Sequence, residues 1–136
     1  MKKIKEDIRT GSYKPAYLLY GSEKYLKKLY RDKLKEGILA GGDEMNYSRF
    51  EGKGIDEAEV AHMAETLPFF AERRLILIEN SGWFKNQSGM ADVVRNLPDT
   101  TVFLFIEEEV DKRNRFYKAV KEIGYICEMN SMEERD

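Results

Sequence analysis

Apolar residues along the chain fall into two patterns, short continuous runs and sets spaced three or four positions apart. The continuous runs lie within 16–20, 73–79 and 101–106. Such runs are typical of strands that are buried on both faces of a parallel sheet. Two shorter stretches, 46–51 and 125–127, are predicted as further strands. In the first of these, Tyr47 and Phe50 should point to opposite faces of the sheet.

The spaced sets predict helices that each bury one face. A short opening helix should end at Gly11, and four further helices are expected between the strands. Ser22, Asp56 and Asp111 are the predicted N-caps of three of them. Strands that alternate with helices predict an α/β fold, a five-stranded parallel sheet with helices on both faces.

The helix that begins at Asp56 leads into a distinctive turn. Its predicted buried stripe consists of Val60, Met63, Ala64 and Leu67. Pro68 should end the helix, because proline disfavours helical geometry at the preceding residue and has no N–H to donate. Phe69 and Phe70 follow at once, and adjacent side chains in a turn do not easily enter one core. The pattern leaves open whether these rings are buried or whether one projects as an anchor for a partner.

Length and composition restrict the class of protein. The chain has 136 residues, which suits one domain, and its net charge is −2, so a surface built wholly for nucleic acid is not expected. No apolar run approaches the ~18 residues of a membrane span. One cysteine and one histidine argue against a disulfide framework, a zinc site and a Ser-His-Asp triad. We expect a cytoplasmic protein without a membrane segment.

The turn after the first strand, Gly21-Ser22-Glu23-Lys24, is where a phosphate-binding loop would lie. It has neither a second glycine nor the Gly-Lys-Ser/Thr that such a loop requires. Glu23 would also repel a phosphate group. The rival hypothesis, a divergent P-loop or Rossmann-like nucleotide enzyme, would use Glu79 at the end of the central strand. A solvated strand end or a helix cap is the preferred interpretation of Glu79.

Four other features are interpreted more simply as core or solvent-exposed residues than as catalytic or ligand-binding sites. The acidic run 107–109 with Asp111 could hold a cation but is typical of a solvated loop. His62 should lie at or near the surface, and Cys127 should lie in the core. One helix face is basic and could contact DNA weakly, although such faces usually serve solubility; its residues are Lys24, Lys27, Lys28, Arg31 and Lys35.

Three segments together resemble the delta subunit of bacterial DNA polymerase III, a clamp loader subunit. They are PAYLLYGSE at 15–23 with Tyr25-Leu26 after it, LPFFAERRL at 67–75, and VDKR at 110–113 with FYK at 116–118. The resemblance implies an AAA+ domain of the P-loop NTPase kind whose nucleotide site is degenerate. It implies that residues 1–130 are the N-terminal, clamp-binding domain, and that 131–136 begin a linker to a lid domain and a collar domain.

In this family the hydrophobic turn enters a pocket on the sliding clamp, the beta subunit, and favours an opened clamp. The turn corresponds here to Leu67, Pro68, Phe69 and Phe70, with Phe-Phe where the family often has Leu-Phe. The resemblance further implies no catalytic residue, metal or cofactor in this domain, since ATP hydrolysis belongs to sister subunits. Contact with those subunits would use the domains that follow, and contact with DNA would be indirect or weak.

Overall fold

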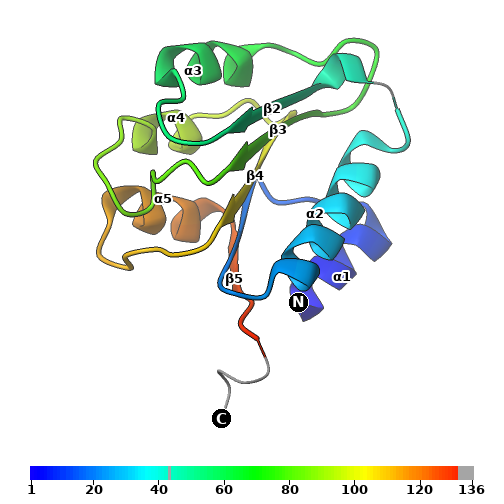
Figure 1. The fold of residues 1–136 in the computed structure, drawn as a ribbon. Helices are drawn as coiled ribbons and strands as arrows, with labels where there is room; N and C mark the ends of the chain where they lie inside the picture. Colours follow the sequence, from blue (N-terminus) through cyan, green and yellow to red (C-terminus); the bar gives the residue numbers. More distant parts are fainter. Residues whose placement is uncertain (43, 132–136) are drawn as a thin grey trace.

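A parallel sheet of five strands forms the centre of the computed structural model, which describes residues 1–42 and 44–131 (Figure 1). Its strands are β1 (Ala16–Tyr20), β2 (Tyr47–Glu51), β3 (Arg74–Glu79), β4 (Thr101–Glu107) and β5 (Tyr125–Glu128). They lie in the order β2-β3-β4-β1-β5, and every neighbouring pair is parallel. The predicted five-stranded parallel sheet is confirmed.

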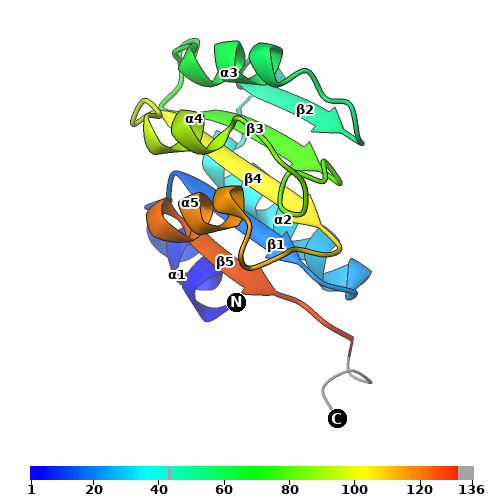
Figure 2. The same ribbon diagram turned by 90° about the vertical axis from the view of Figure 1, so that its left-hand side faces the viewer.

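Helices cover both faces of this sheet (Figure 2). α1 (Lys2–Thr10) and α2 (Lys24–Leu39) pack on one face. α3 (Glu57–Glu65), α4 (Ala91–Arg95) and α5 (Arg115–Ile123) pack on the other. A short 3₁₀ helix, η1 (Glu44–Asn46), leads into β2. Tyr47 packs against the first layer and Phe50 against the second, as the alternation within a strand predicts.

The three central strands β3, β4 and β1 are buried along their whole length, because a helix layer covers each face. Four of the aromatic rings between the sheet and the helices α3–α5 are Trp83, Phe84, Phe105 and Phe116, which meet edge-on or tilted. Cys127 is buried, as predicted, and His62 is exposed. The core therefore consists of two apolar layers separated by the sheet.

Several local predictions were wrong. Glu23, not Ser22, caps α2, and its side chain accepts a hydrogen bond from the N–H of Tyr25. Asn114, not Asp111, caps α5, because the chain makes a further turn before the helix begins. Leu67 does not continue the buried stripe of α3, since the helix ends at Glu65. Except for residue 131, the predicted linker at 131–136 lies outside the described residues.

Two findings apply to the part of the chain that the structure describes. No helix within it has the length and apolar character needed to cross a membrane. Nor does it bring together three or more His, Cys, Asp or Glu side chains in an arrangement that could hold a metal ion.

Candidate functional site

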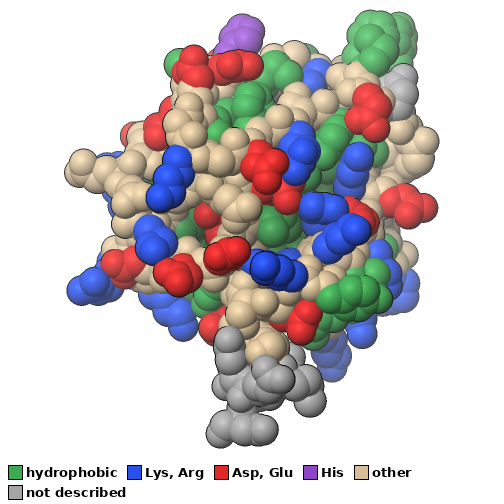
Figure 3. Space-filling view, viewed as in Figure 1, with side chains coloured by type: hydrophobic (Ala, Val, Ile, Leu, Met, Phe, Trp, Pro, Cys, Tyr) green, Lys and Arg blue, Asp and Glu red, His purple; other side chains and the backbone are tan. Residues whose placement is uncertain are grey.

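The connection between α3 and β3 exposes apolar side chains at one corner of the molecule. Phe70 is 94% exposed, Leu67 67% and Phe69 51%. Figure 3 shows hydrophobic atoms projecting at the corner where Figure 1 draws this connection. Neither ring belongs to the two core layers. The alternative in which both phenylalanines are buried is therefore wrong.

Local backbone geometry explains why the rings project. Thr66 leaves the helical conformation with φ −76° and ψ 128°, and Pro68 follows two residues later. Phe70 has a φ of 51°, in the left-handed region that bulky residues rarely adopt. The two rings meet edge to face with centroids 4.6 Å apart. The two rings therefore pack on each other as an aromatic pair.

Two buried polar side chains hold this turn, and the sequence did not reveal either of them. Asn46 bonds both the N–H and the carbonyl oxygen of Phe69, at 2.6 Å and 2.9 Å. Arg74 donates to the carbonyl oxygens of Thr66 at 3.1 Å and Leu67 at 3.3 Å. A usable signal was present for Arg74, because an arginine that starts a fully apolar strand must find buried acceptors.

A small cavity lies beside the exposed rings. Its volume is about 250 Å³, and its lining includes Leu39 and Gly42 from the end of α2 together with Asn46, Phe69, Phe70 and Ala71. The Phe69–Phe70 pair thus borders this cavity as well as solvent. Phe70 in particular can contact a partner without first leaving a packed position.

At the carboxyl end of the parallel strands, the turn after β1 is occupied by the chain itself. Glu23 donates its backbone N–H to the carbonyl oxygen of Met129 at 2.9 Å, and Ser22 donates its own to Oδ1 of Asn130 at 3.4 Å. These N–H groups stand where a phosphate loop would present its donors. Gly21 also lies so close to Met129 that a Cβ atom there would be 2.2 Å from the carbonyl oxygen.

Glu79 is not the solvated strand end that the sequence predicted. It is buried, and its carboxylate receives Arg49 Nε at 2.6 Å and Arg31 Nη1 at 3.1 Å. Such a doubly bonded carboxylate is held in place by charge-assisted hydrogen bonds. Both oxygens of Glu79 are engaged, so the arrangement serves the structure better than it would serve a catalytic base.

The acidic run after β4 is also only partly solvated. Glu107 is buried, and it accepts hydrogen bonds from the backbone N–H and hydroxyl of Ser81 and from the N–H of Gly82. Burial raises the pKa of the Glu107 carboxyl, and the hydrogen bonds oppose that rise. Glu108 and Glu109 are exposed, as predicted for a loop.

The basic face of α2 is less available than the sequence predicted. Lys27 is buried, and its Nζ donates to the carbonyl oxygen of Glu107 at 3.2 Å. Arg31 pairs with Glu79, and Lys35 lies 4.0 Å from the centre of the Tyr47 ring. Lys24 and Lys28 remain exposed. The five cations thus do not form one open surface for phosphates.

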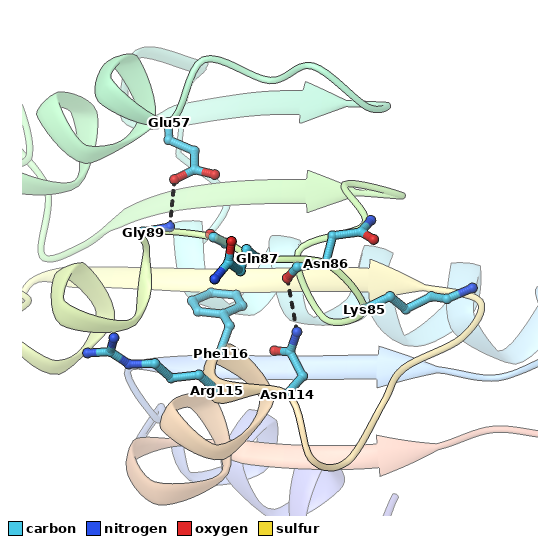
Figure 4. Close-up of a pocket in the computed structure, with 9 residues that line it drawn as sticks. Glu57, Lys85, Asn86, Gln87, Gly89, Asn114, Arg115 and Phe116 are labelled. Atoms are coloured by element: carbon cyan, nitrogen blue, oxygen red, sulfur yellow. Dashed lines mark hydrogen bonds between the residues drawn. The ribbon is translucent and has the colours of Figure 1, made fainter.

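A polar pocket of about 570 Å³ lies on the face covered by α3–α5 (Figure 4). Glu57 reaches from α3 to the N–H of Gly89 at 2.9 Å, and Asn114 bonds the carbonyl oxygen of Asn86 at 3.0 Å. Phe116 contributes an apolar ring to the lining. None of the binding residues predicted from the sequence lines this pocket.

Comparisons with known proteins point to one family. The family model described as DNA polymerase III, delta subunit, matches residues 17–130. The DNA polymerase III subunit delta of Bacillus subtilis (strain 168) is 24% identical over 144 residues, which cover 96% of this chain and 42% of that protein. This chain therefore spans less than half the length of that curated relative.

Two solved structures share the fold. The Bacillus subtilis DNA clamp loader delta protein matches with a TM-score of 0.84 at 22% identity, over 96% of this chain and 42% of that one. A DNA polymerase III gamma subunit-related protein from Thermotoga maritima matches with a TM-score of 0.66 at 10% identity, over 97% and 47% of the two chains. The AAA+-like fold predicted from the sequence is confirmed.

Proposed function

Since the chain belongs to the family of the delta subunit of DNA polymerase III, we propose that it is the domain that binds the sliding clamp during DNA replication. Leu67, Pro68, Phe69 and Phe70 would form the contact, and the phenylalanine pair would enter an apolar pocket on the clamp. The domain would help to open the clamp for loading onto primed DNA. It would act in the cytoplasm with other clamp loader subunits.

One observation carries this proposal: two phenylalanine rings that pack on each other are exposed to solvent at a corner of the domain. Phe70 is 94% exposed and Phe69 51%. Burial of one such side chain stabilises a complex by roughly 1.5–3 kcal/mol. Phe70 and the exposed half of Phe69 would then contribute about 2–4.5 kcal/mol, or a factor of tens to about two thousand in affinity.

The rival function, nucleotide chemistry, has less support from the geometry. The backbone donors of the turn after β1 bond the chain's own Met129 and Asn130. Glu79 is engaged by two arginines rather than directed at a ligand. DNA contact would be limited to the exposed Lys24 and Lys28, so we propose that any such contact is weak.

The decisive experiment compares two variants against the sliding clamp of the same organism. Phe69→Ala combined with Phe70→Ala should abolish binding in surface plasmon resonance and leave the fold intact. Tyr25→Ala is the matched control, because Tyr25 is another exposed aromatic residue, 70% exposed, at the start of α2. Its affinity should equal that of the unaltered chain. Unchanged affinity in the folded double variant would refute the proposed function.

A further inference from the structure

A buried amide lies directly behind the aromatic pair. Asn46, the last residue of η1, is only 4% exposed and precedes Phe69 by 23 residues. Its Oδ1 accepts the N–H of Phe69, and its Nδ2 donates to the carbonyl oxygen of the same residue. One side chain thus satisfies both backbone groups of Phe69, much as a neighbouring strand would do.

Packing of the rings does not hold the turn in this conformation. Phe70 is almost fully exposed, and a φ of 51° is disfavoured for any residue that carries a Cβ atom. A cavity of about 250 Å³ also borders both rings, so they are not closely packed there. A strained conformation of this kind persists only where surrounding contacts determine it. Two contacts of this kind are the hydrogen bonds from Asn46 to the backbone of Phe69.

We propose that Asn46 is a positioning residue for partner binding, which holds Phe69 and Phe70 in their projecting conformation before the partner arrives. The inference rests on the proposed function, because it concerns the same turn. A surface that is ordered in advance loses less conformational entropy on binding and therefore binds more tightly. Arg74 holds the other side of the turn, but it also begins β3, so Asn46 offers the cleaner test.

The test compares Asn46→Ala with a matched amide elsewhere. Asn114 also bonds two backbone groups, the N–H of Tyr117 and the carbonyl oxygen of Asn86, and it lies near the polar pocket rather than near the turn (Figure 4). Asn46→Ala should weaken binding to the sliding clamp by about tenfold, which corresponds to ~1.4 kcal/mol. Asn114→Ala should lower the melting temperature comparably and leave the affinity unchanged.

Two further measurements separate positioning from general stability. Hydrogen exchange at the N–H of Phe69 should be much faster in Asn46→Ala than in Asn114→Ala. In a chain that already carries Phe70→Ala, adding Asn46→Ala should cost less than about threefold in affinity, because only the half-buried Phe69 ring remains to be positioned. If Asn46→Ala lowers the affinity by the same factor with and without Phe70→Ala, the proposal is overturned.

The outcomes also distinguish this inference from the proposed function. If the unaltered chain does not bind the clamp, the proposed function fails, and the exchange measurement alone decides whether Asn46 orders the turn. If the chain binds and Phe70→Ala weakens it, but Asn46→Ala binds normally, the positioning role is refuted. Should Asn46→Ala not fold, Asn46→Asp replaces it, since that side chain keeps the acceptor for the N–H of Phe69 and loses the donor.

Discussion

Replacing Phe70 by glycine should give a more stable protein than replacing it by alanine. Both variants lose the same aromatic ring and its edge-to-face contact with Phe69. They differ in the backbone, because Phe70 has a φ of 51° and alanine remains strained there while glycine does not. The left-handed conformation costs a residue with a Cβ atom roughly 1–2 kcal/mol. The unfolded chain is more flexible with glycine than with alanine, and this entropy lowers the stability of Phe70→Gly by about 0.5–1 kcal/mol.

From the centres of these two ranges, the net difference in the free energy of unfolding is about 0.75 kcal/mol in favour of Phe70→Gly. For a chain of this size it corresponds to a melting temperature higher by roughly 2–4 °C. Calorimetry and urea denaturation of the two variants side by side measure it, and both should bind the sliding clamp equally poorly. A Phe70→Ala variant as stable as Phe70→Gly would show that the turn does not hold a left-handed residue at this position.

Four further predictions follow from the buried polar groups and the turn after β1. Glu79→Gln should lower the free energy of unfolding by about 1.5–3 kcal/mol, because two charge-assisted hydrogen bonds weaken, while affinity for the clamp, measured by surface plasmon resonance, stays unchanged. Burial raises the pKa of the Glu107 carboxyl in the folded state above its ordinary 4.5. The contribution of Glu107 to stability is therefore present below that value and is lost as pH rises through the folded pKa. In urea denaturation between about pH 4 and about pH 8, the free energy of unfolding should depend less on pH in Glu107→Gln than in the unaltered chain. Gly21→Ala should destabilise the fold by about 2 kcal/mol or more, since its Cβ would collide with the Met129 carbonyl oxygen. The unaltered chain should show no micromolar binding of ATP with magnesium in calorimetry. A stable Gly21→Ala variant, a Glu79→Gln variant that loses clamp affinity, or heat of ATP binding would each contradict the corresponding assignment.

Hydrophobic patterning alone determined the elements and the class of fold. Apart from the polar residues at the ends of β3 and β4, the runs that became β1, β3 and β4 carry apolar or aromatic side chains on both faces, and such strands are stable only between two layers of helices. Pro68 marked the end of α3 to within a few residues, because its constraints are local. The exact caps were less accessible, since Ser22 and Asp111 compete with Glu23 and Asn114 for the same role and only the path of the chain selects between them.

Only the tertiary structure decided which side chains meet across long separations. Nothing local to Asn46 indicates that its amide holds Phe69, or that Arg31 and Arg49 reach Glu79 from two different elements. These contacts depend on the strand order, which brings β2 beside β3 and places α2 over the sheet. The exposure of Phe70 was open for the same reason: apolar residues are ordinarily buried, and only the assembled surface shows that no other part of the described chain covers this ring.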